Sequence, residues 1–216
     1  QISRDQGLQG SAMRLDFDFR GSGGFVVARK AFPLEIPARY SFGLNIRGTA
    51  PANIFEFKLV DRTNQNVWRY RVEAFDFPEE WQPLTIRSSQ VVFAWGPLGG
   101  GPPTNIAALE LVIAAGPGGQ GTICFENLWF RDDTYRLTPV VRASSALPGH
   151  EPEKALSASR TSSWRSEATD EPQWLIIDFL QEREYGGLVI HWEKGLQAKQ
   201  FDVQVSADGH EWSTAY

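Results

Sequence analysis

Cysteine, histidine and long apolar runs are scarce in this sequence. Its 216 residues include one cysteine, Cys124, which excludes an intramolecular disulfide and a cysteine-rich zinc site. The three histidines stand alone, without the HxH or HExxH spacing that places two imidazoles on one metal. No segment approaches the roughly 20 uninterrupted apolar residues of a membrane-spanning helix, so we expect no membrane span.

Catalytic signatures and an excess of basic residues are also missing. The sequence has no GxSxG, no P-loop and no GxGxxG before a helix. Adjacent acidic pairs such as Glu79 and Glu80 cannot flank a glycosidic bond from separate elements. Basic and acidic residues number 14 and 14 in residues 1–136, and 7 and 12 in residues 137–216. We therefore expect a protein that is not an enzyme and that binds no nucleic acid.

Short segments of alternating polarity fill the first part of the chain. In residues 13–20, Leu15, Phe17 and Phe19 alternate with charged residues, as in a strand with one buried face. Turns rich in Gly and Pro, such as residues 96–103, separate these segments. The sequence predicts an antiparallel sandwich without long helices. Its other strands are expected at residues 25–32, 39–48, 53–61, 67–75, 83–89, 90–96, 108–116 and 121–130.

The composition changes near residues 136–139, where a run rich in Ser, Pro and charge begins. Strand-like segments return at residues 174–179, 187–192 and 201–206. We therefore predict two all-β domains, residues 1–136 and residues 137–216.

The second domain carries a specific set of motifs. They read SSWRSE around Trp164, QWLIIDF at 173–179, LVIHW at 188–192 and VQVSADGHEW at 203–212. In this respect it resembles the discoidin, or coagulation factor V/VIII type C, family of galactose-binding-like jelly rolls. The resemblance stops before the last strands of that family, which implies a truncated sandwich. Its unpaired edge then favours self-association with another chain, packing on the first domain, or disorder. Neutral Ser157–Ser159 replaces the family's calcium-binding Asp-Gly-Asp, so we expect no metal here.

The first domain is similar to β-sandwich carbohydrate-binding modules of the same superfamily. The similarity lies in AMRLDFDF, the EFKLVD and VWRYRV pair, EEWQPLTI and GTICFENLWF. It implies a galactose-binding-like jelly-roll sandwich, and many such modules hold a structural calcium. On this resemblance Glu126, with Asp16 or Asp18, would be the ligands. The alternative is that these three are ordinary outward-facing strand residues.

A charged patch on two neighbouring strands is the leading candidate site. If Phe55 and Phe57 face the core, alternation places four charged residues on the open face. Arginine forks suit carboxylates and vicinal hydroxyls, so acidic polysaccharides belong among the expected ligands. The alternative is a solvated surface of mixed charge that binds nothing. The four residues are Glu56, Lys58, Arg69 and Arg71.

Trp95 precedes a Gly- and Pro-rich turn, where an indole could be a platform for a sugar ring. The alternative is a buried indole followed by an ordinary turn. The strand position of five other tryptophans predicts that they lie in the core. These are Trp81, Trp129, Trp164, Trp174 and Trp192.

Together these features predict a non-catalytic carbohydrate-binding region whose partner is a polysaccharide or other glycan. We expect it in a larger bacterial protein that is secreted, periplasmic or at the cell surface, such as a glycoside hydrolase with accessory modules. The alternative is a protein or lipid adhesion module of the discoidin type.

Overall fold

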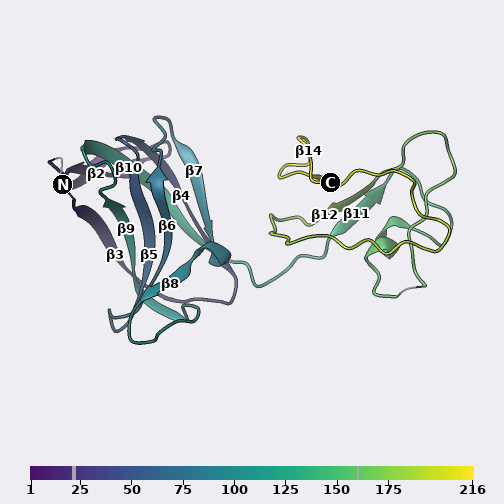
Figure 1. The fold of residues 1–216 in the computed structure, drawn as a ribbon, viewed down its shortest axis with the longest axis horizontal. Coiled ribbons are helices and arrows are strands. Elements are labelled where there is room, and N and C mark those ends of the chain that lie inside the picture. The colour runs from purple at the N-terminus through teal and green to yellow at the C-terminus, as the bar shows by residue number, and fades with distance from the viewer. Residues whose placement is uncertain (21–22, 160) are drawn as a thin grey trace. The chain divides into compact units, whose positions relative to one another are not determined.

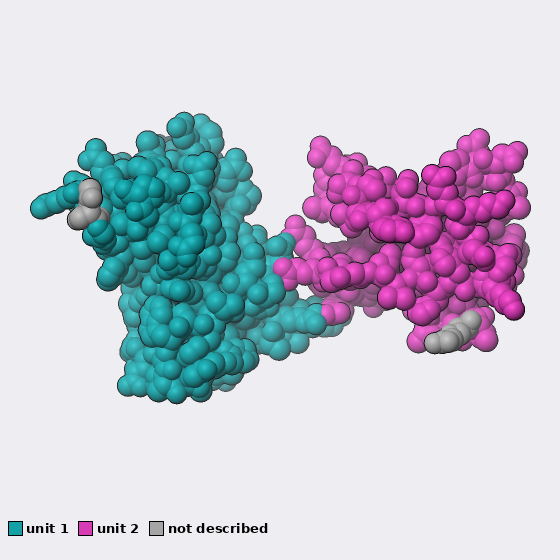
Figure 2. Space-filling model, viewed as in Figure 1, with its two compact units in different colours: residues 1–135 teal, residues 136–216 magenta. Residues whose placement is uncertain are grey.

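The structure, a computed structural model, describes residues 1–20, 23–159 and 161–216. The chain divides into two compact units, residues 1–135 and residues 136–216 (Figure 2). This division falls one residue before the boundary expected from composition. Within the described residues, no helix is long and apolar enough to span a bilayer.

The first unit is a sandwich of two five-stranded antiparallel sheets (Figure 1). Sheet A has the order β1-β2-β10-β4-β7, and sheet B has the order β3-β9-β5-β6-β8. Strands distant in sequence pair in both sheets, as in a jelly roll. The strands of sheet A are β1 (Ile2–Gln6), β2 (Ser11–Asp18), β10 (Gln120–Asp132), β4 (Tyr40–Thr49) and β7 (Gln82–Arg87). Those of sheet B are β3 (Phe25–Glu35), β9 (Asn105–Ala114), β5 (Asn53–Asp61), β6 (Val67–Phe75) and β8 (Val92–Trp95).

The core lies between the two sheets and is built from alternate residues of their strands. Phe55, Phe57 and Leu59 of β5 are completely buried. The ring of Phe42, from sheet A, lies 5.0 Å from that of Phe57, from sheet B, and so joins the two layers. The predicted all-β sandwich is confirmed, and the only helical element of the described part of this unit is the 3-10 turn η1 (Ser88–Gln90).

The second unit has little regular structure. Its elements are β11 (Val140–Ala143), η2 (Pro152–Leu156), β12 (Leu175–Asp178), β13 (Gln204–Val205) and β14 (Ser213–Thr214). The strands form two separate two-stranded sheets, β11-β12 and β13-β14.

Two expectations for the second unit are wrong in this structure. Residues 188–192 form no strand, because no neighbouring segment pairs with them. Trp174 and Trp192, expected in the core, are exposed, since the two small sheets offer no second layer to cover them. Val141 is the one apolar residue that is buried among the described residues of this unit. The other three tryptophans expected in the core, Trp81, Trp129 and Trp164, are only half-buried and lie outside the core cluster.

Candidate functional site

The outer face of sheet B brings the predicted charged residues together. Antiparallel register places Lys58 of β5 opposite Arg69 of β6, and Glu56 opposite Arg71. On the other side of Lys58 the row continues through Glu110 of β9 to Arg29 of β3. Charged side chains therefore form a continuous row across four strands.

Glu56 is the centre of this cluster, and it is buried rather than open as expected, with 3% of its surface exposed. Its Oε1 accepts hydrogen bonds from Nη1 of Arg69 and Nη1 of Arg71, both at 2.7 Å. Its Oε2 lies 2.8 Å from Nζ of Lys58. Alternation predicted the face on which Glu56 lies, but not that three longer side chains would cover it.

The pKa of Glu56 reflects two opposing effects. Burial raises this pKa, but hydrogen bonds from Lys58 and Arg71 outweigh burial and hold it below its usual value. Glu56 therefore remains ionised at neutral pH, as a fixed counter-charge that holds three cations in place.

Arg71 is fully engaged by carboxylates. Its Nε and Nη2 donate to the two oxygens of Glu73 at 2.6 and 2.9 Å, while Nη1 donates to Glu56. Hydrogen bonds to Glu73 and Glu56 raise the pKa of its guanidinium. Arg29, at the other edge of the face, pairs with Glu110 at 2.7 Å and also donates to Asn64.

The side chain of Trp95 lies against this cluster and is also open to solvent. Lys58 Nζ and Arg69 Cζ lie 5.1 and 5.8 Å from the centre of its ring, within cation–π range. Trp95 is 46% exposed, which agrees with the first of the two interpretations that the sequence left open. The structure thus gathers all five predicted sugar-binding residues at one place on sheet B.

The loop that follows Trp95 is fixed by the turn between β5 and β6. Asn66 Oδ1 accepts a hydrogen bond from the Leu98 amide at 2.8 Å, and Asn66 Nδ2 donates to Asp61 at 2.8 Å. Gly96 has φ of 136°, and a Cβ there would lie 2.4 Å from Asn66 Oδ1. Only glycine fits this approach, which holds the backbone beside Trp95.

Sequence reasoning missed several members of the site. Glu73 shares the face of Arg69 and Arg71 by the two-residue period, so alternation could have found it. Glu110 lies on β9, beside β5, and Arg29 lies on β3, beyond β9; no local sequence pattern reveals this strand order. Asn66 acts through a turn whose hydrogen bonds depend on the three-dimensional approach of residue 98.

The three carboxylates expected to bind calcium are not brought together. Asp16 of β2 accepts hydrogen bonds from Arg14 and Thr122, whereas Glu126 accepts them from the Leu8 amide and Asn45.

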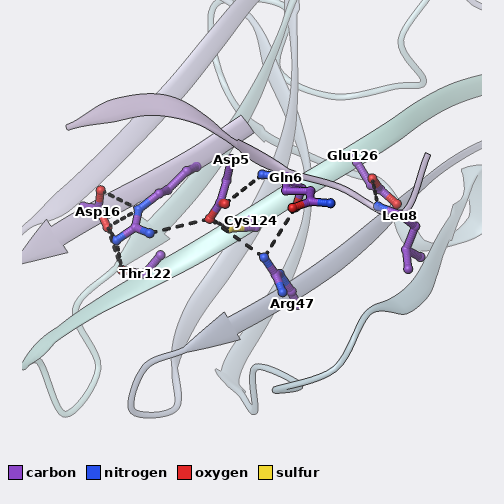
Figure 3. A network of polar contacts seen from close by, with 9 residues as sticks. Asp5, Gln6, Leu8, Asp16, Arg47, Thr122, Cys124 and Glu126 are labelled. Carbon is purple, nitrogen blue, oxygen red and sulfur yellow. Dashed lines mark hydrogen bonds and ion pairs between the residues drawn. The ribbon is translucent and has the colours of Figure 1, made fainter. Parts of the chain in front are cut away.

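Figure 3 shows Asp16 and Glu126 at opposite ends of a polar network. Asp16 pairs with Thr122, four residues from Glu126 along β10, a separation of about 13 Å at the usual strand rise. Asp18 accepts from the Arg20 amide.

No group of three His, Cys, Asp or Glu side chains among the described residues is arranged to hold a metal. As a set, the three residues do not fit one ion, and calcium in the first domain stays a prediction.

Comparison with known proteins gives one family match, in the second segment. Residues 140–216 match the model of the F5/8 type C domain, which confirms the predicted discoidin resemblance. A comparison with curated proteins found no match.

Solved structures similar to this chain include carbohydrate-binding modules. One is a family 11 module from Clostridium thermocellum in complex with a β-1,3-1,4-mixed-linked tetrasaccharide, 15% identical over 59% of this chain and 79% of that chain, with a TM-score of 0.48. A second, TmCBM61 in complex with β-1,4-galactotriose, is 16% identical over 62% and 88%, with a TM-score of 0.36.

A third is a putative sugar binding protein from Bacteroides thetaiotaomicron, 13% identical over 62% of this chain and 82% of that chain, with a TM-score of 0.38. The chain therefore combines a sandwich of two five-stranded sheets with a segment, residues 140–216, that matches the F5/8 type C, or discoidin, family.

Proposed function

We propose that the first unit is a non-catalytic carbohydrate-binding module that binds a glycan on the outer face of sheet B. One observation carries this proposal: the exposed ring of Trp95 lies directly against hydrogen-bonding cations that a buried carboxylate holds in place. Sugar recognition needs an aromatic surface for the apolar side of a pyranose and fixed polar groups for its hydroxyls. This face combines the two.

The polar part of the site is rigid before any ligand arrives. Lys58, Arg69 and Arg71 all bond to Glu56, so their positions are set by the sheet and not by the ligand. Binding then costs less side-chain entropy than it would with free lysines and arginines. The face is open, so one module is expected to bind weakly and to gain strength through repetition or a neighbouring module.

The test compares the full chain with the Trp95→Ala variant. Isothermal titration against a panel of neutral and acidic polysaccharides is expected to detect binding that Trp95→Ala weakens by about tenfold, the value of one aromatic contact. Trp81→Ala, at the residue before β7 of sheet A, is the matched control and should leave the affinity unchanged. Absence of binding to every member of the panel, or equal loss in the control, contradicts the proposal.

The predicted setting is part of this proposal: a secreted, periplasmic or cell-surface protein in which the module assists another domain. A polysaccharide outside the cell is the ligand that such a module would meet. Fractionation of the producing cells, with detection of the chain by antibody, tests the setting. Detection in the cytoplasm alone contradicts it.

The second unit supports a second candidate function, protein or lipid adhesion of the discoidin type. Large apolar side chains are exposed there, among them Leu188, Val189 and Trp192. Exposed apolar clusters are typical of surfaces that meet another molecule. Residues 140–216 also match the F5/8 type C model.

Cell binding before and after enzymatic deglycosylation separates the two candidates. Binding that survives deglycosylation and is lost in Trp192→Ser supports adhesion through the second unit. Binding that disappears with the glycans, and also in Trp95→Ala, supports the first unit. Self-association through the second unit stays a prediction, and sedimentation at several concentrations of the full chain tests it.

A further inference from the structure

Two neighbouring arginines on β6 have the same first partner and differ in their second. Arg69 and Arg71 each donate from Nη1 to Oε1 of Glu56 at 2.7 Å. Arg71 uses its remaining edge, formed by Nε and Nη2, to hold both oxygens of Glu73. Within the part of the chain that the structure describes, the same edge of Arg69 has no hydrogen-bond or ion-pair partner.

The sheet itself explains why the second carboxylate is missing at Arg69. The residue two positions after Arg71 is Glu73, whereas the residue two positions after Arg69 is Arg71. Across the ladders, Arg69 is opposite Lys58 on one side and Val92 on the other. None of these neighbours can provide a carboxylate.

The balance of charges around Arg69 also indicates that a carboxylate is missing there. Arg71 pairs with Glu73 as well as with Glu56, and Arg29 pairs with Glu110. Arg69 and Lys58 are then left with Glu56 alone. One positive charge is therefore in excess, at the two cations that lie against Trp95.

We propose that Arg69 is the specificity residue of this face and binds the carboxylate of an acidic sugar, so that the ligand is a uronic acid-containing polysaccharide. This inference rests on the proposed carbohydrate-binding function and names its ligand class. The Nε and Nη2 edge of Arg69 takes the two carboxylate oxygens side-on, as the same edge of Arg71 takes Glu73. The sugar ring lies on the exposed indole of Trp95.

The accessibility of Arg69 fits this role. Its side chain is 29% exposed, so part of it reaches solvent, while the carboxylate that fixes it is only 4% exposed. Lys58 is 12% exposed and contributes positive charge more than direct contact. A neutral sugar would leave the excess charge uncompensated, whereas one carboxylate for each bound ring balances it.

The test uses matched pairs of ligands. Oligogalacturonate and oligomannuronate are titrated beside the same oligosaccharides with their carboxyls reduced to primary alcohols. The wild-type chain is expected to bind one of the acidic oligosaccharides about ten- to hundredfold more tightly than its reduced form, the value of charge-assisted hydrogen bonds. Higher salt should reduce this preference, because the exposed part of the contact is screened.

Variants assign the preference to Arg69. Arg69→Gln should abolish it, and Arg69→Lys, which keeps the charge but not the fork, should retain only part of it. Arg29→Gln is the matched control, on the same face and about three strand spacings, roughly 14 Å, away. It should keep the full preference. Thermal unfolding of each variant confirms that it is folded.

Each other outcome has a definite meaning. Equal binding of acidic and reduced oligosaccharides, weakened by Trp95→Ala, overturns the inference and leaves the proposed function standing. Preference for a sulfated over a carboxylated oligosaccharide also overturns the inference. Absence of binding to any neutral or acidic oligosaccharide contradicts the proposed function itself.

Discussion

At the scale of single residues, the features that matter most are charges whose surroundings differ from what their position on a strand implies. Glu56 and Lys58 lie on the same face of sheet B, yet their exposure differs. The Glu56 side chain is 4% exposed, and that of Lys58 is 12% exposed. A carboxylate that satisfies three cations holds them in place, and it is itself held by them. Removal of such a charge affects more than one contact.

Glu56→Gln is therefore expected to destabilise the first unit by about 3 kcal/mol, because three cations lose their counter-charge. Urea unfolding of the two proteins measures the change. Glu110→Gln is the control: it breaks one pair with the more exposed Arg29 and should cost less than about 1 kcal/mol. Equal losses in the two variants would show that Glu56 is no more than an ordinary surface charge.

At this scale the sequence predicted which charged residues share the outer face of sheet B, because strands of period two assign each side chain to a face. The sequence could not predict how far neighbouring side chains would cover each of these residues. Whether Glu56 is open or buried depends on where Lys58, Arg69 and Arg71 place their side chains. Trp174 and Trp192 show the converse, since an apolar strand pattern predicts a core only if a second layer exists to cover it.

At the scale of elements, the turn from β5 to β6 is held by a set of hydrogen bonds to one carboxylate. Asp61 accepts hydrogen bonds from the amides of Gln65 and Asn66, from the Asn66 side chain and from Thr63. Burial raises the pKa of Asp61, but these hydrogen bonds outweigh it and lower the pKa to about 2. This turn also fixes the loop after Trp95, because Asn66 accepts a hydrogen bond from the Leu98 amide.

This lowered pKa makes the turn sensitive to acid. Asp61 contributes stability above its usual pKa of 3.8, and this contribution is lost as the pH falls from about 4 towards 2. After solvent screening we expect a loss of about 1 kcal/mol. Urea unfolding at several pH values should show a smaller acid-dependent loss in Asp61→Asn than in the wild type. Identical pH profiles would contradict this role.

Strand positions in the first unit were predicted closely, and the exceptions have physical causes. The range predicted for β5 agrees with the structure because its alternation is strict and both neighbours are present. β1 was missed because its sequence, ISRDQ, is short and mostly polar, as an edge strand can be. Residues 188–192 have the composition of a strand but lack a partner, and a strand forms only with one.

At the scale of the whole molecule, the two units differ in how much core they have. The main core cluster draws every one of its members from residues 1–135. Residues 1–135 alone are therefore expected to unfold cooperatively, at a temperature within a few degrees of the main transition of the full chain. Calorimetry of the fragment and the full chain measures this. A fragment that fails to fold would contradict it, and one that folds gives a smaller protein for the binding experiments.

Cys124 makes it possible to measure how often the first unit opens locally. It lies on β10, between β2 and β4, is 3% exposed, and burial raises the pKa of its thiol. Its neighbours Ile123 and Phe125 face the core, whereas its Sγ lies on the outer face of sheet A, 3.5 Å from Asp5 Oδ2. A thiol reagent can reach it only when the side chains that cover this face open. Because it is the chain's single cysteine, the rate at which the intact protein is alkylated gives the frequency of that opening at one known strand, without any introduced label.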